Sequence, residues 1–153
     1  MKYINEMTLR FKSYSANESF ARSAVAAFCV QINPTLDEVI DIKTAVSEAV
    51  TNCVVHAYPT HAGMVEIWVG LTEDTAYITV SDSGIGISNP ARAREPFFTT
   101  KPEQERSGMG FTVIESFMDS LELLKTTGGG TTVKMSKKLG GGLNCQSMTI
   151  QSA

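Results

Sequence analysis

The sequence predicts a single α/β domain of the α+β kind, a two-layer sandwich with helices on one face of a mixed, mostly antiparallel sheet. Its 153 residues fit one domain. One segment with the two-residue period of a strand precedes two segments with the helical period. The later strand segments form two pairs, each joined by a short turn as in a β-hairpin. Strands joined in this way run antiparallel, and the helices then cover one face of the sheet.

The first strand is expected over residues 6–13, where apolar and polar residues alternate. A capping box at residues 15–18, Ser-Ala-Asn-Glu, predicts that a helix begins there. Asn33-Pro34 ends this helix. Its expected apolar face consists of Phe20, Ala24, Ala27, Phe28 and Ile32.

A second capping box, Thr-Leu-Asp-Glu at residues 35–38, opens a longer helix that is expected to reach about residue 57. A turn over residues 58–63 leads into two strands, 64–71 and 75–82. The residues expected to be buried along the longer helix are Leu36, Val39, Ile40, Val46, Val50, Cys53 and Val54.

Residues 87–107 form an irregular segment, rich in charge, proline and serine, that lies inside the domain. Long loops of this kind are more often functional than idle. A helix is expected from Gly108 to Ser120, followed by a hairpin of strands 121–126 and 131–137. The domain is expected to span residues 1–139, and residues 140–153 are expected to form a disordered polar tail.

The composition excludes several classes of protein. A net charge of -3 and a pI near 5.4 argue against direct binding of nucleic acid. No apolar run is long enough to span a membrane, and the N-terminus lacks the apolar segment of a signal peptide, so a cytoplasmic protein is expected. The three cysteines form no CxxC pair and are interpreted as reduced thiols. His56 and His61 lack partners at metal-ligand spacing, which favours structural or surface roles.

Glu48 and Asn52 are the first candidate site residues. They lie four residues apart on the longer helix and project from the same face. A carboxylate among apolar neighbours needs compensation, which a bound cation and a water would provide. An amide oxygen suits Mg²⁺, and Glu48 could accept a proton from an attacking hydroxyl or water. For this pair alone, a polar helix face open to solvent remains the alternative.

A strand ends in the second candidate, Asp82-x-Gly84-x-Gly86. The glycines allow a sharp turn and a close approach to a planar ligand. The carboxylate could accept a hydrogen bond from an exocyclic amine such as adenine N6. Asp-x-Gly is also an ordinary end to a strand.

The third candidate, Ser107-Gly108-Met109-Gly110, precedes an apolar helix. The free N–H groups at a helix N-terminus can bind phosphate. Lys101 and Arg106 supply positive charge nearby, although a solvated loop would also carry such residues.

Together, these motifs in this order and spacing resemble the GHKL ATPase family, which includes gyrase B, a heat-shock chaperone, mismatch-repair ATPases and histidine kinases. Gly130-Thr131-Thr132 is similar to the late Gly-Thr element of the family. The resemblance implies the Bergerat ATP-binding fold, with ATP/ADP and Mg²⁺ as ligands. It implies nucleotide contacts from Asn52, Asp82, Gly84, Gly86, Thr99, Lys101, Arg106, Ser107, Gly108, Met109, Gly110 and Thr131.

Residues 47–52, 96–102 and 105–111 resemble more closely the anti-sigma-factor serine/threonine kinases of spore-forming bacteria, above all those that act on sigma-F. This resemblance implies a homodimer that inhibits a sigma factor and phosphorylates a serine of an anti-anti-sigma factor. It implies that Glu48 is the catalytic base and Asn52 the Mg²⁺ ligand. Residues 17–22 are also similar, and there Glu18 and Arg22 are expected to contact protein partners.

Two other functions remain open. A nucleotide-sensing binder could sequester a sigma factor without phosphorylating anything, although such a binder needs no base at Glu48. The chain could also be the equivalent kinase of a general-stress sigma system. A histidine kinase would need a phosphoacceptor histidine and a dimerisation helix pair, for which we find no room. Phosphoryl transfer in trans is therefore the leading hypothesis.

Overall fold

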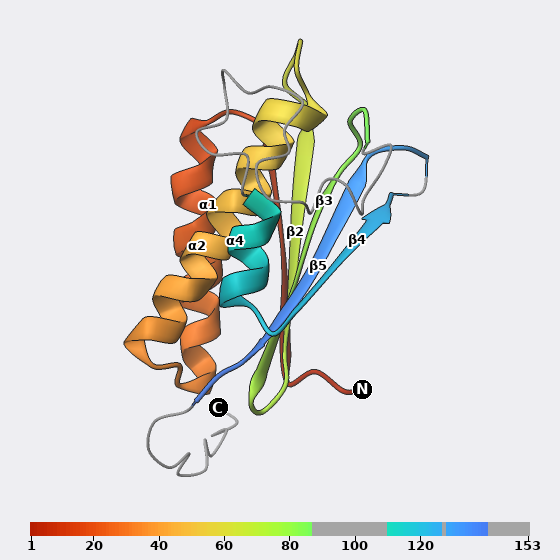
Figure 1. Cartoon of the computed structure of the whole chain (residues 1–153). Helices are drawn as coiled ribbons and strands as arrows, with labels where there is room; N and C mark the ends of the chain where they lie inside the picture. Colours follow the sequence, from red (N-terminus) through yellow and green to blue (C-terminus); the bar gives the residue numbers. More distant parts are fainter. Residues whose placement is uncertain (87–109, 127, 141–153) are drawn as a thin grey trace, which may run out of the picture.

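A computed structural model of the chain describes residues 1–86, 110–126 and 128–140. Three α-helices in these ranges pack on one face of a five-stranded sheet, as Figure 1 shows. The strand order is β1-β2-β3-β5-β4, and all four pairings are antiparallel. The α+β sandwich is confirmed, and within the described part of the chain its sheet is antiparallel throughout. The elements are β1 (Asn5–Lys12), α1 (Ala16–Cys29), α2 (Leu36–Asn52), β2 (Met64–Leu71), β3 (Thr75–Asp82), α4 (Gly110–Phe117), β4 (Ser120–Lys125) and β5 (Thr131–Lys138).

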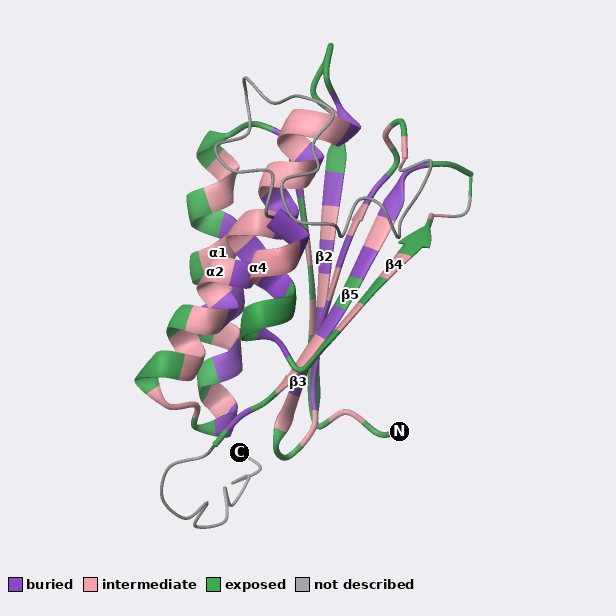
Figure 2. Ribbon diagram, viewed as in Figure 1, coloured by how far each residue is buried: buried purple, intermediate pink, exposed green. Residues whose placement is uncertain are grey.

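The central strands alternate as half-buried strands do, and Figure 2 shows the resulting buried bands. In β3 the buried positions are Ala76, Ile78, Val80 and Asp82. The last of these is a carboxylate, so the same alternation that builds the core directs Asp82 toward the helices. No helix in the described ranges is long and apolar enough to cross a membrane.

The prediction of a capping box at the start of α1 is wrong, because no such box forms, although the helix begins where the sequence predicted. Ser15 already has helical torsion angles (φ -57°, ψ -30°), and its side chain makes no capping hydrogen bond. The carboxylate of Glu18 instead pairs with Arg22 at 3.1 Å.

The predicted apolar face of α1 is also largely wrong. Phe20 is 55% exposed and Ala27 is exposed. The buried residues are Ala21, Val25, Ala26 and Cys29, followed by Ile32 in a short 3₁₀ turn. Every residue from 24 to 30 is apolar, so the pattern alone could not show which side of the helix faces the sheet.

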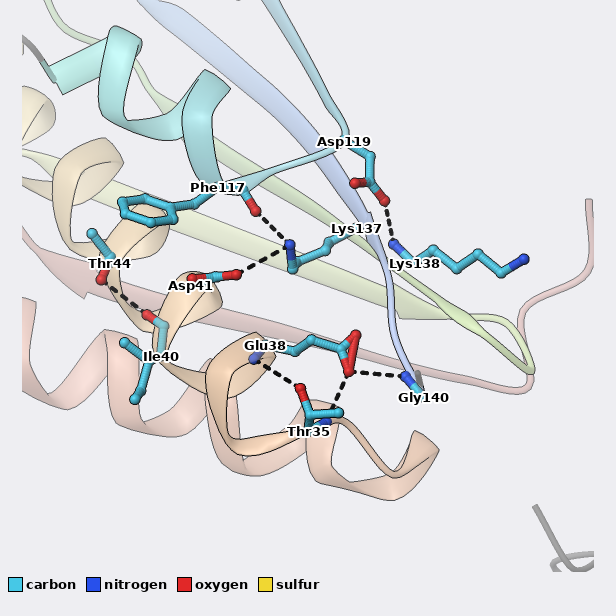
Figure 3. Close-up of polar contacts among 10 residues, drawn as sticks. All are labelled: Thr35, Glu38, Ile40, Asp41, Thr44, Phe117, Asp119, Lys137, Lys138 and Gly140. Carbon is cyan, nitrogen blue, oxygen red and sulfur yellow. Dashed lines mark hydrogen bonds and ion pairs between the residues drawn. The ribbon is translucent and has the colours of Figure 1, made fainter. Parts of the chain in front are cut away.

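The second capping box is confirmed, as Figure 3 shows. Thr35 Oγ1 accepts a hydrogen bond from the N–H of Glu38 at 3.2 Å, and Glu38 Oε1 accepts one from the N–H of Thr35 at 2.8 Å. Leu36 and Ile40 are nevertheless 76% and 52% exposed, contrary to prediction. The inward face of these first turns carries Glu38, Asp41 and the fully buried Ile42 instead.

The end of the described chain is tied to the start of α2. Leu139 is buried, and the N–H of Gly140 donates to Glu38 Oε1 at 3.2 Å (Figure 3). The predicted domain end at residue 139 stays a prediction. The tail predicted beyond it lies almost entirely outside the described residues and stays a prediction.

Candidate functional site

Asp82 is the central polar residue of the site. It ends β3 and is only 6% exposed. Its Oδ1 accepts hydrogen bonds from the N–H groups of Gly84 at 3.0 Å and Thr131 at 3.1 Å. Burial raises the pKa of Asp82, and these two N–H donors act in the opposite direction. One carboxylate oxygen therefore joins the turn after β3 to the first residue of β5.

The second oxygen of Asp82 faces a thiol. Cys53 Sγ lies 3.6 Å from Asp82 Oδ2 and 3.4 Å from the carbonyl oxygen of Ala49. Burial, and then the neighbouring carboxylate, raise the pKa of Cys53 well above its ordinary value, so the thiol stays a hydrogen-bond donor. Because the backbone occupies Oδ1, Oδ2 is the oxygen that retains capacity to accept from a ligand.

The turn after β3 packs backbone to backbone against the end of α2. There, α2 continues into a π-helical turn, Cys53–Ala57. The N–H of Ile85 donates to the carbonyl oxygen of Ala57 at 3.1 Å, and a Cβ on Gly84 would overlap that oxygen. π-turns of this kind often mark functional sites. Glycine at position 84 thus permits the approach of two backbones.

Tyr58 fixes the same turn from its other side. Its hydroxyl donates to the carbonyl oxygen of Met64 at 2.7 Å and accepts from the N–H of Ser83 at 2.8 Å. Tyr58 is 8% exposed. One tyrosine therefore links the residue after Asp82 to the start of β2.

Glycines supply the remaining close approach. Gly130 has a φ of +85°, and a Cβ on it would overlap the carbonyl oxygen of Asp82 and lie 2.7 Å from Ser83 Cα. Gly86 has a φ of +77° and lies beside the Gly130 carbonyl. The two glycine-containing turns around Asp82 are thus in direct contact.

Glu48 and Asn52 meet the first residue of α4. A Cβ on Gly110 would lie 3.3 Å from Glu48 Oε2 and 3.5 Å from both amide atoms of Asn52. Both side chains belong to half-buried residues. Asn52 Nδ2 is buried and has no hydrogen-bond partner within the described structure. Such an atom costs about 1–3 kcal/mol and is suited to a site that a ligand completes.

The donor set fits the nucleotide and the cation that the sequence predicts. Mg²⁺ often binds only one or two protein oxygens together with the phosphates of a substrate. The amide oxygen of Asn52 could be one of these protein oxygens. The N-terminus of α4 at Gly110 is a suitable place for phosphate groups. Asp82 Oδ2 is available to the amine of a base. We infer that α2, the turn after β3 and α4 surround one site.

Several predicted site residues cannot be placed. Thr99, Lys101, Arg106, Ser107, Gly108 and Met109 lie outside the described residues. The two predicted partner contacts do lie together on α1: Arg22 Nη1 is 3.1 Å from Glu18 Oε1 and 3.4 Å from Ser47 Oγ on α2. Arg22 therefore contacts the residue next to Glu48.

Sequence reasoning missed Cys53, Ala57 and Tyr58 as parts of the site. Cys53 appeared only as a buried helix residue, and Tyr58 only as part of a turn. Cys53 directly follows Asn52, which is a local signal that could have placed its thiol near the site.

Comparison with known proteins identifies the family. Residues 12–137 match the histidine kinase-like ATPase domain. This chain belongs to that family. The predicted GHKL resemblance is thereby confirmed, and the domain is a nucleotide-binding one.

Relatives within the family are named anti-sigma F factors. The chain is 52% identical over 140 residues to one from Caldanaerobacter subterraneus subsp. tengcongensis, an alignment that covers 92% of this chain and 98% of the relative. It is 54% identical over 136 residues to one from Bacillus thuringiensis, covering 88% and 93%. The chain therefore belongs with these proteins, as the more specific resemblance predicted.

A solved structure supports the fold. The crystal structure of the RsbU and RsbW domains of a Mycobacterium tuberculosis protein has a TM-score of 0.63 and 18% identity to this chain. The match covers 88% of this chain and 32% of that longer chain. At this identity the likeness shows a shared fold alone.

Proposed function

We propose that the protein is an anti-sigma factor with serine kinase activity. It binds and inhibits a sporulation sigma factor of the sigma-F type and, with Mg-ATP, phosphorylates a serine of its anti-anti-sigma factor. The observation that carries this proposal is the position of Glu48 and Asn52, one helical turn apart on α2 and directly against Gly110. Relatives of more than 50% identity that are named anti-sigma F factors support it.

The site residues that the structure describes have separate roles in the proposed function. Asp82 Oδ2 accepts a hydrogen bond from the exocyclic amine of adenine, while Thr131 and Gly84 hold the carboxylate through Oδ1. Asn52 would hold Mg²⁺ through its amide oxygen, and the ion would supply positive charge near the phosphates. The roles of Thr99, Lys101, Arg106, Ser107, Gly108 and Met109 as phosphate contacts stay predictions from the family resemblance.

Glu48 is the proposed base. The substrate serine hydroxyl loses its proton to the Glu48 carboxylate as its oxygen bonds to the γ-phosphorus. The bond between that phosphorus and the β,γ-bridging oxygen breaks, and ADP leaves. Catalysis of this kind depends mainly on positioning and charge stabilisation. A base is needed only if phosphoryl transfer occurs, so Glu48 favours a kinase over a nucleotide-sensing binder.

The direct test incubates the protein with γ-labelled ATP and a candidate anti-anti-sigma protein. Label on a serine of that substrate is the expected result. Saturable ATP binding with no transfer under any condition would instead favour the nucleotide-sensing binder. A pull-down of sigma factors with and without ADP then distinguishes a sporulation sigma factor from a general-stress one.

Asn52→Ala is expected to weaken Mg-ATP binding by about tenfold or more, because a contact to a charged group is worth about 1.5–3 kcal/mol. The melting temperature should not fall, since the buried Nδ2 atom has no partner to lose. Isothermal titration calorimetry in Mg²⁺ and in EDTA provides the measurement and its control. The variant should differ most from wild type in Mg²⁺; an unchanged affinity there would contradict the metal role.

Arg22→Glu is expected to weaken binding of both protein partners at least tenfold, because it reverses a charge that lies beside Ser47 and pairs with Glu18. Nucleotide affinity should be unchanged. Arg10→Glu is the matched control, since Arg10 lies on β1 and pairs with Glu66 on β2. If the two variants bound the partners with equal affinity, the assignment of Arg22 to the interface would be contradicted.

The family resemblance also implies a homodimer, which we propose for this chain. Light scattering coupled to size-exclusion chromatography tests it, and a concentration-independent monomer would contradict it. A cytoplasmic location, without direct contact to nucleic acid or membrane, completes the proposal.

A further inference from the structure

We propose that Lys137, together with Asp41, is a positioning residue for the nucleotide site. These two residues hold the far end of the helix whose first residue lies against Glu48 and Asn52. The inference rests on the proposed function, because it assumes that nucleotide binds at that first residue. It concerns residues that lie two helical turns or more away from the proposed contacts.

Lys137 connects three elements of the fold. It lies on β5 at a position that points toward the helices, and its side chain is 13% exposed. Its Nζ donates to the carbonyl oxygen of Phe117, the last residue of α4, at 2.6 Å. The same Nζ lies 3.3 Å from Asp41 Oδ2 on α2, as Figure 3 shows. A cation at this place also interacts favourably with the C-terminal end of the helix dipole.

Asp41 lies on the same stripe of α2 as the site residues. Positions 41, 45, 48 and 52 follow one another at helical spacings of four, three and four residues, so they share one face. Ala45, between the two polar ends, is fully buried. The face of α2 that meets α4 therefore carries an acidic anchor at one end and the Glu48–Asn52 pair at the other.

The two helices match in length between these ends. Glu48 lies seven positions after Asp41, and Phe117 lies seven positions after Gly110, so each spacing is about 10 Å along its helix. Gly110 meets Glu48, while Phe117 is joined to Asp41 through Lys137, so α4 runs antiparallel to α2. Lys137 thus sets how far α4 extends along α2, and hence where Gly110 lies.

A helix of eight residues depends on such contacts. Isolated helices of this length are unstable in water, so packing must hold α4 in place. Phe111 and Ile114 bury its apolar side, which resists separation from α2. Apolar packing is less specific about sliding along the helix axis than an ion pair and a hydrogen bond of fixed direction. Loss of Lys137 should therefore allow α4 to shift or fray.

The neighbouring residue offers a matched control. Lys138 lies on the same strand, but its side chain is 74% exposed and pairs with Asp74 beyond β2 at 3.6 Å. Only its backbone N–H contacts Asp119, and a side-chain substitution keeps that bond. Lys138→Met thus repeats the charge and size change of Lys137→Met without touching α4.

The experiment compares wild type, Lys137→Met and Lys138→Met in two measurements. Lys137→Met is expected to weaken Mg-ATP binding by about tenfold, as for loss of one charge-assisted contact. Hydrogen exchange without nucleotide should also become faster in residues 110–117. Lys138→Met should resemble wild type in both. Asp41→Asn keeps Lys137 and should bind Mg-ATP with an affinity between those of wild type and Lys137→Met. It replaces Lys137→Met in the comparison if that variant does not fold.

The outcomes separate this inference from the proposed function. A wild-type protein that does not bind Mg-ATP contradicts the proposed function. Wild-type binding, with Lys137→Met and Asp41→Asn equal to Lys138→Met in affinity and exchange, contradicts the inference alone. Uniformly faster exchange across the whole domain in Lys137→Met would also overturn it, because the residue would then support the fold in general.

Discussion

Gly130→Ala is expected to destabilise the protein by about 2–5 kcal/mol, the largest loss for any single methyl group added to the site. An alanine there must adopt a φ of +85°, and its Cβ would overlap the Asp82 carbonyl and come within 2.7 Å of Ser83 Cα. Both neighbours are backbone atoms of a central strand and the turn that follows it. They cannot move aside as a flexible side chain would.

Gly128→Ala is the control that isolates this close approach. Gly128 has nearly the same φ, +88°, but a Cβ there would meet no atom within 4 Å. Its substitution should cost only the backbone strain, about 1–2 kcal/mol. Urea unfolding of both variants, with the slope checked for constancy, gives the difference. Equal losses would mean that the Gly130 turn can withdraw from Asp82.

Gly130→Ala and Gly128→Ala should also differ in nucleotide binding. The N–H of Thr131 follows Gly130 directly and donates to Asp82 Oδ1. If Gly130→Ala displaces this N–H, the carboxylate loses one of the donors that fix its orientation. Any folded fraction of Gly130→Ala should therefore bind adenine nucleotides more weakly than Gly128→Ala does.

Most elements could be predicted because their signals are local. The bounds of β2 and β3 agree with those predicted, since alternation and turn residues define both ends. The capping box at Thr35 and Glu38 was predicted because both its hydrogen bonds form within four residues. At Ser15 the same sequence pattern failed, since Ser15 already has helical torsion angles and Glu18 pairs with Arg22.

The helix faces were harder to predict. Leu36 and Ile40 are exposed because β5 and the residues after it present Lys137 and Gly140 to this part of α2. Those partners lie about a hundred positions later in the chain. Local periodicity carries no information about them.

Within the site, the pairing of Glu48 with Asn52 follows from helix geometry alone. The backbone contacts do not. Gly84 approaches Ala57, and Gly130 approaches Asp82, only after the sheet and α2 have assembled. Among the three consecutive glycines at 128–130, the sequence singled out Gly130 only through its resemblance to the Gly-Thr element of the family. Neither its contact with Asp82 nor the open space beside Gly128 could be predicted.

Glu48→Gln is expected to reduce phosphoryl transfer about 10²–10⁴-fold, the usual contribution of a general base. Glutamine preserves the length and shape of the side chain and its proximity to Gly110, but it cannot accept the serine proton at neutral pH. ATP affinity should stay within about threefold of wild type, because the proposed nucleotide contacts come from Asn52, Asp82 and the turns around them. Single-turnover transfer and calorimetric binding measure the two quantities separately.

Glu66→Gln is the matched control for that variant. It makes the same chemical change in a residue that lies on β2 and pairs with Arg10. Transfer by Glu66→Gln should equal that of wild type. A Glu48→Gln protein that transfers phosphate as fast as Glu66→Gln would show that the carboxylate is not the base. If both transfer and ATP affinity fell together in Glu48→Gln, Glu48 would instead hold the nucleotide, and the serine proton would have another acceptor.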